Sequence, residues 1–264
     1  MSSAEISAAV ALLAPHLVAV ALCAARLLPV TFLCPILGGA SAPAPVKVGL
    51  ALSLSLALHV AGGVAPAGPV QHAWPFLGLM TKEFVFGATI GLVSALPFDA
   101  ARIGGRFIDL FRGSSAEAAL PVAGTRESAT GDGLYQMLVA LVATGAAFPI
   151  VVGSVWRSFG LVRLGGYVPT EAAVLQVATL AGTAMATGLA VGAPIAGAVM
   201  AVDCALGMAS RFAPQMNLQD VGAPLRILGG GAVLWLAVGI LSDRLLARVM
   251  ASDAAVSALI SVAR

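Results

Sequence analysis

Residues 172–202, AAVLQVATLAGTAMATGLAVGAPIAGAVMAV, decide the fold class, because these 31 positions hold no Asp, Glu, Lys or Arg. A helix needs about 20 apolar residues to cross the roughly 30 Å hydrocarbon core of a bilayer. Residues 6–25 and 133–156 are likewise free of charged side chains over at least that length. The sequence therefore predicts an all-α, polytopic protein built from membrane-type helical hairpins.

The composition supports this class. Hydrophobic residues make up 59% of the 264 positions and charged residues 10%, whereas a soluble domain carries about 25% charged residues. The formal net charge is +2, and the basic residues are scattered along the chain without forming a basic patch. No nucleic-acid partner is therefore expected. The three cysteines, Cys23, Cys34 and Cys204, form no metal-type cluster and are expected to pack as small apolar side chains.

Six apolar segments give the expected helical passes, and they are residues 6–25, 48–61, 76–98, 133–156, 172–202 and 227–242. The long fifth segment contains Pro194. It is expected to form either one long helix or two helices that break at this proline. Residues 26–47 contain four prolines and are not expected to form one regular helix. Irregular backbone at membrane depth requires cover by protein or water, which favours a chain packed inside a larger assembly.

Two pairs of glycines are spaced as small-xxx-small motifs, Gly87 with Gly91 and Gly188 with Gly192. Such faces let helices approach closely, which replaces the hydrophobic driving force that lipid does not supply. Packing within the chain and packing against partner subunits are both open at this stage.

Four charged residues form a candidate charged stripe, namely Asp99, Arg102, Arg106 and Asp109. Their spacing of three, four and three residues places them on one face of a helix with opposite charges in mutual reach. Lipid disfavours such a face, whereas a partner subunit or a water-filled lumen accepts it. The alternative is an ordinary solvated helix.

Further candidates for buried charge lie near the apolar segments, and they are Lys82, Glu83, Asp203 and Arg211. Ionisable residues at membrane depth are candidates for function, although an adjacent pair such as Lys82 and Glu83 can also anchor a helix end at the interface.

No motif for catalysis is present in the sequence. His16, His59 and His72 are isolated, so no zinc-hydrolase helix is formed. The chain also lacks a G-x-S-x-G nucleophile turn, a phosphate-binding loop and a dinucleotide-binding turn. We therefore expect neither an enzyme nor a protein with a cofactor or a metal site.

Short motifs follow one another in order along nearly the whole chain. They are Arg26-Leu-Leu-Pro29; Pro43-Ala-Pro-Val-Lys47; Lys82-Glu83 followed by Gly87 and Gly91; Leu96-Pro97-Phe98; Gly104-Gly105-Arg106-Phe-Ile-Asp109-Leu-Phe-Arg112-Gly113-Ser-Ser115; Asp203 with Gly207 and Arg211; and Pro214-Gln-Met-Asn217 before Pro224-Leu-Arg226. This series resembles the T subunit of the type III secretion export apparatus, the SctT family, whose flagellar relative is FliR. The stretch that starts at Asp109 is more similar to the injectisome branch than to the flagellar one.

The resemblance implies one export-gate domain over residues 1–264, a structural and gating subunit of a protein-export channel in the bacterial inner membrane. It implies assembly with the small membrane subunits R and S, contact with the U and V subunits, and a complex raised in part toward the periplasmic side. Unfolded proteins would be the substrates, with energy from a separate ATPase and the proton gradient. A stand-alone secondary transporter of small solutes is the alternative, although the two halves of the sequence show no similarity.

The resemblance also implies a pore plug after the Pro97-Phe98 segment, and the matching residues are Leu110, Phe111, Arg112, Gly113, Ser114 and Ser115, within residues 110–119. Gly113 and the two serines are expected to end the preceding helix. Leu110 and Phe111 supply apolar bulk, and a dewetted apolar constriction is one way to close a channel.

Overall fold

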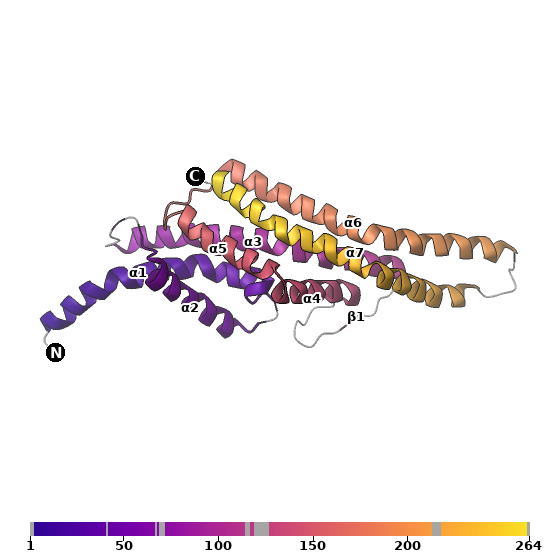
Figure 1. The fold of residues 1–264 in the computed structure, drawn as a ribbon, viewed down its shortest axis with the longest axis horizontal. Coiled ribbons are helices and arrows are strands. Elements are labelled where there is room, and N and C mark those ends of the chain that lie inside the picture. Colours follow the sequence, from indigo (N-terminus) through magenta and orange to yellow (C-terminus); the bar gives the residue numbers. More distant parts are fainter. Residues whose placement is uncertain are drawn as a thin grey trace. The chain divides into compact units, whose positions relative to one another are not determined.

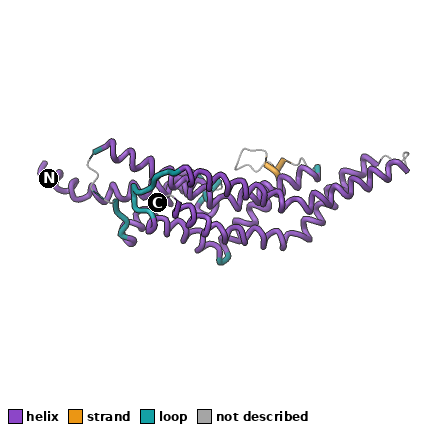
Figure 2. Tube along the Cα trace, turned by 90° about the horizontal axis from the view of Figure 1, so that it is seen from above, coloured by secondary structure: helices purple, strands orange, loops and turns teal. Residues whose placement is uncertain are grey.

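A computed structural model describes residues 3–40, 42–66, 68, 72–113, 117–118, 127–212 and 218–262. Nearly all of this described chain is helical, as Figure 2 shows by colour. Its elements in order are α1 (Ser3–Leu33), the 3-10 helix η1 (Pro35–Leu37), α2 (Ala44–Gly62), α3 (Ala73–Arg112), β1 (Glu117–Ala118), β2 (Glu127–Ser128), α4 (Ala129–Thr144), α5 (Ala147–Leu161), α6 (Glu171–Phe212) and α7 (Leu218–Val262) (Figure 1). The predicted all-α class is confirmed, since the two strands form one antiparallel pair of two residues each.

Among the described residues, five helices are long and apolar enough to cross a membrane. These candidate spans are Leu12–Leu33, Ala44–Gly62, Ala73–Arg112, Glu171–Phe212 and Gly222–Ser261. Helices α4 and α5 together pass the same test as a sixth span, bent by 81° between them. Five of the six predicted apolar segments therefore lie each within one helix, and the fourth, residues 133–156, is divided between α4 and α5.

The helix break lies beside Pro149 and not at Pro194. Helix α6 runs without interruption through Pro194, so a break there is wrong. Buried side chains on both sides of this proline, Val191 and Ile195, hold the helix in place despite the one lost hydrogen bond. The fourth apolar segment is the one that is divided, because a helix running into Pro149 would drive its ring against the carbonyl of Gly145, where α4 is capped.

The chain divides into two compact units, which are described separately. The first unit comprises Met1–Ala95, Phe148–Leu180 and Ala251–Arg264, and the second comprises Leu96–Ala147 and Ala181–Met250. Helices α3, α6 and α7 each contribute residues to both units. A single export-gate domain over the whole chain stays a prediction.

In the first unit, α1 packs on α2 and on the N-terminal part of α3. Helix α1 continues through Pro29 to Leu33, and α2 begins after Pro43, so residues 26–47 are not one helix, as predicted. A Cβ atom on Gly87 would overlap the carbonyl of Arg26, and one on Gly91 would lie 3.1 Å from the Val30 Cα. This glycine pair therefore serves packing within the chain.

In the second unit, α3 crosses α6 at backbone contact distance. A Cβ atom on Gly188 would lie 2.8 Å from the Ala100 carbonyl oxygen, and one on Gly192 would lie 2.8 Å from that of Gly104. The second small-xxx-small motif thus also packs within the chain. Helices α6 and α7 lie antiparallel beside each other here (Figure 1), with Arg226 Nε 3.0 Å from Asp203 Oδ1.

Candidate functional site

All four residues of the charged stripe lie on α3 in the second unit. Arg102 Nε lies 3.2 Å from Asp132 Oδ1 on α4, and its guanidinium stacks 4.2 Å above the ring of Tyr135. Asp109 is buried, Asp99 is half-buried and Arg106 is exposed. Part of the stripe is therefore used to join α3 to α4, and Arg106 is the member that faces outward.

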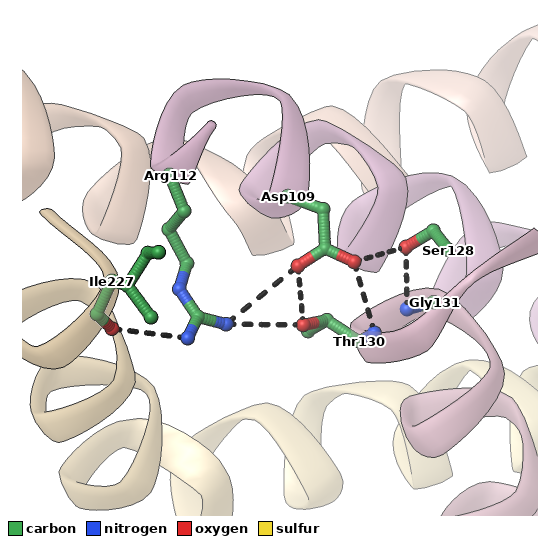
Figure 3. A network of polar contacts seen from close by, with 6 residues as sticks. All are labelled: Asp109, Arg112, Ser128, Thr130, Gly131 and Ile227. Atoms are coloured by element: carbon green, nitrogen blue, oxygen red, sulfur yellow. Dashed lines mark hydrogen bonds and ion pairs between the residues drawn. The ribbon is translucent and has the colours of Figure 1, made fainter. Parts of the chain in front are cut away.

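Asp109 is the centre of a polar network at the end of α3, shown in Figure 3. One carboxylate oxygen, Oδ2, accepts hydrogen bonds from the Ser128 hydroxyl at 2.5 Å and from the Thr130 backbone N–H at 3.0 Å. The other oxygen, Oδ1, accepts one from the Thr130 hydroxyl at 2.5 Å. The carboxylate thus holds the first residues of α4.

The local sequence explains why this junction forms. Ser128 is the N-cap of α4, and its Oγ accepts a hydrogen bond from the Gly131 N–H at 2.9 Å. The unpaired N–H groups and the dipole of a helix N-terminus favour a nearby carboxylate. The two helices approach to backbone contact, because a Cβ atom on Gly105 would overlap the backbone of Gly131. Asp109, one helical turn beyond Gly105, then reaches the α4 N-terminus.

Arg112, the last residue of α3, adds a link to α7. Its Nη1 donates to the Thr130 hydroxyl at 3.2 Å and lies 3.6 Å from Asp109 Oδ1, while its Nη2 donates to the Ile227 carbonyl at 3.0 Å (Figure 3). The aliphatic part of the side chain packs on Gly230, where a Cβ atom would lie 2.7 Å from Arg112 Cγ. One arginine therefore joins the end of α3 to the start of α4 and to α7.

The residues assigned to the plug begin at this junction. Helix α3 ends at Arg112 and Gly113 adopts a φ of +65°, so the predicted helix end is confirmed. Leu110 is 74% exposed, and Phe111 packs edge-on against Phe107 with ring centroids 4.9 Å apart. Ser114 and Ser115 lie outside the described residues.

The two ends of the segment between α3 and α4 lie close together. Asp109 and Arg112 on its N-terminal side contact Ser128 and Thr130 on its C-terminal side, and Glu117 pairs with Ser128 in the short β1–β2 ladder. The described ends of the connection between α3 and α4 are therefore held together. We call this polar network of Asp109, Arg112, Ser128 and Thr130 the loop clamp.

A second polar centre lies in the first unit, around a fully buried ion pair. Arg26 Nε lies 2.6 Å from Glu83 Oε2, and both side chains have no exposed surface. Arg26 also donates to the Ser158 carbonyl at 3.0 Å and to the Val162 carbonyl at 3.2 Å. Glu83 Oε1 accepts a hydrogen bond from the Gly165 N–H at 2.6 Å. The pair thus ties α1, α3 and the end of α5 together.

Aromatic rings complete the surroundings of Arg26. Its guanidinium lies 4.8 Å from the ring centroid of Phe86 and 4.4 Å from that of Phe159. Sequence reasoning quoted Arg26 in a motif but did not select it as a site residue. The available signal was its position directly after the charge-free residues 6–25, where a basic side chain needs a buried partner or water.

The other charged candidates are separated from these two centres. Lys82 is exposed although its neighbour Glu83 is buried, so the adjacent pair does not act together. Asp203 pairs with Arg226 between α6 and α7, with both side chains partly exposed. Arg211 is exposed near the end of α6. Within the part of the chain that the structure describes, no group of three or more His, Cys, Asp or Glu side chains is placed to hold a metal ion.

Taken together, these observations define a polytopic helical membrane protein with a fully buried ion pair and a part-buried polar network that holds the two ends of the α3–α4 connection together. Residues 17–251 match the family described as "Bacterial export proteins, family 1", and the chain belongs to that family. The resemblance to the SctT and FliR proteins is thereby confirmed.

Individual relatives come from both branches of the resemblance. The chain is 27% identical over 156 residues to the "Flagellar biosynthetic protein FliR" of Bacillus subtilis (strain 168), a match that covers 58% of this chain and 60% of that protein. It is 26% identical over 174 residues to the "Yop proteins translocation protein T" of Yersinia pestis, covering 64% of this chain and 67% of the relative. The chain thus spans about three fifths to two thirds of the length of these relatives.

Proposed function

We propose that this chain is a structural and gating subunit of a type III protein-secretion export channel in the bacterial inner membrane. Its substrates are unfolded proteins in transit, and its partners are the R and S subunits of the export apparatus together with the U and V subunits. Membership in the bacterial export family supports this role, as do relatives named for flagellar biosynthesis and for translocation.

The loop clamp is the observation that carries the gating part of the proposal. In this proposal the plug is attached at the mouth of the pore and closes it with an apolar group, because a dewetted apolar constriction is one way to close a channel. The clamp supplies the attachment with charge-assisted hydrogen bonds, which are stronger than neutral ones. Leu110, exposed on the last turn of α3, supplies the apolar group. Residues 110–115 act as the plug in this proposal.

Exposed apolar surface on α7 supports the structural part. Little of the apolar part of this helix is buried within the chain, and Leu228, Trp235 and Leu236 are each more than 70% exposed. Lipid or partner subunits must cover such a face. In the proposed complex partner subunits cover it, and the gate is raised in part toward the periplasmic side.

Co-purification in mild detergent tests this function. We expect an affinity-tagged chain expressed with its R and S subunits to elute as one hetero-oligomer, with a native mass that contains all three. The same chain reconstituted alone should catalyse no solute flux. A monodisperse monomer that transports small solutes in vesicles would instead support the secondary-transporter alternative and overturn the proposal.

A further inference from the structure

An open groove of about 770 Å³ lies in the first unit, between the end of α2 and the end of α5. One wall is the turn that follows α2, from Gly62 to Pro66, and Pro66 pairs with Leu164 in a parallel β-bridge. Trp156 of α5 also lines the groove and lies against α2, since a Cβ atom on Gly62 would lie 3.9 Å from its ring. The floor is apolar and buried, with Leu58 and Phe159.

Two arginines line this otherwise apolar groove. Arg163 is exposed and makes no ion pair with any residue that the structure describes. Arg157 also lines the groove and is paired with Asp253 of α7, with about half of its side chain exposed. Asp253 does not line the groove, and none of the groove's lining residues carries a negative side chain. The groove therefore combines net positive charge with apolar walls.

The position of the groove along the helices restricts what can fill it. Candidate span Ala44–Gly62 ends at the groove, and so does the bent α4–α5 span, which ends at Leu161. The ends of membrane-crossing helices lie at the level of the lipid headgroups, where Trp and Arg side chains are typical.

We propose that this groove binds the headgroup phosphate of an acidic phospholipid. Arg163 forms the direct contact, because a guanidinium matches phosphate oxygens in a forked, bidentate geometry that Lys does not reproduce. Arg157 contributes a second positive charge, and Trp156 with the apolar floor contacts the glycerol and the first acyl carbons. The proposal depends on the chain crossing a membrane and not on its role in protein export.

Fluorescence of Trp156 offers a local measurement of this binding. The sequence contains three tryptophans, so Trp74→Phe and Trp235→Phe leave Trp156 as the single emitter. The purified protein in detergent, with its partner subunits where these co-purify, is titrated with phosphatidylglycerol or phosphatidylcholine carrying brominated acyl chains, which quench a nearby indole. We expect saturable quenching by phosphatidylglycerol at a concentration about tenfold lower than by phosphatidylcholine. One charge-assisted hydrogen bond changes the affinity by about this factor.

Three variants identify the contact. Arg163→Gln should raise the half-saturating phosphatidylglycerol concentration about tenfold, whereas Arg163→Lys should recover only part of the loss. Arg211→Gln, an exposed arginine of the second unit, is the matched control and should change nothing. Circular dichroism confirms that each variant is folded.

Three results would overturn the proposal. They are equal quenching by the two lipids, an Arg163→Gln variant that behaves like the parent protein, and full competition by millimolar inorganic phosphate, which would assign the groove to a free anion. Failure of the export proposal would leave these lipid measurements unaffected.

Discussion

Asp109 at the end of α3 accepts two hydrogen bonds from Thr130 at the start of α4, one from its backbone N–H at 3.0 Å and one from its hydroxyl at 2.5 Å. The two residues are 21 positions apart, and residues 113–127 run between them. An ionised acceptor strengthens both bonds. The contact therefore fixes the base of the loop that we propose to be the plug.

Removal of this carboxylate should open the loop base. Asp109→Ala leaves the Thr130 N–H and hydroxyl without their acceptor, and we expect a loss of about 2–4 kcal/mol in the stability of this region. Limited proteolysis within residues 113–127 should accelerate accordingly. Asp203→Ala removes a partly exposed ion pair and should cost about 1 kcal/mol or less. Equal cleavage rates in the two variants would show that Asp109 does not hold the loop.

Removing one charge of the buried Arg26–Glu83 pair should destabilise the protein more than replacing both charged residues with neutral ones. Glu83→Ala leaves a buried guanidinium without its counter-ion, which costs about 3–5 kcal/mol. The double variant Arg26→Met with Glu83→Gln removes both charges, while the new amide oxygen can still accept from Gly165, so it should be more stable than Glu83→Ala. Thermal unfolding in detergent measures the difference. Lys82→Met, at the exposed neighbouring position, is the control, and a comparable loss there would contradict the account.

The crossing of α3 and α6 should tolerate no side chain at its two glycines. In Gly188→Ala and Gly192→Ala the added methyl group meets a backbone carbonyl at 2.8 Å, and overpacking of this kind costs about 1–3 kcal/mol. Gly197→Ala on the same helix adds a methyl group in open space and should be neutral or stabilising by up to about 1 kcal/mol. Thermal unfolding of the three variants separates contact from helix propensity. Equal effects at all three positions would show that the close approach of α3 and α6 does not cause the loss of stability.

The charged stripe should divide into a structural and an outward-facing part. Arg102→Glu places a second carboxylate beside Asp132, so the isolated chain itself should lose stability. Arg106→Glu changes an exposed residue, so we expect a smaller loss of stability than in Arg102→Glu, together with a failure to assemble or to support secretion. Thermal unfolding and a secretion assay distinguish the two effects. Normal secretion by the Arg106→Glu variant would return the stripe to the solvated-helix alternative.

The fold class and the helix positions could be predicted because charge-free length alone identifies membrane-type helices. The end of α3 could also be predicted, since Gly113 accepts a positive φ without strain. The choice between Pro194 and Pro149 could not, because it depends on whether packed side chains hold the helix on both sides of the proline. Sequence spacing marks where a helix can break, and tertiary packing decides which break occurs.

The candidate sites show the same division. Helical spacing correctly placed Asp109 on a polar face, but its partners Ser128 and Thr130 are distant in sequence and lie together only through the contact of Gly105 with Gly131. Arg26 and Glu83 are 57 positions apart, and no local pattern links them. Adjacent Lys82 and Glu83 suggested a pair, yet a helix points neighbouring residues about 100° apart, so one is buried and the other exposed.

Closed-state conductance of the assembled complex in a planar bilayer tests the gating claim most directly. The variant replaces Leu110 and Phe111 with Ser and residues 114–119 with a Gly-Ser linker, and it keeps Asp109 and Arg112 so that the clamp persists. Leu12→Ser, at a similarly exposed leucine of α1, is the control. We predict that the variant complex assembles and conducts ions without substrate, whereas the parent and control complexes stay closed. Equal closed-state conductance in all three would place the seal elsewhere and contradict the account.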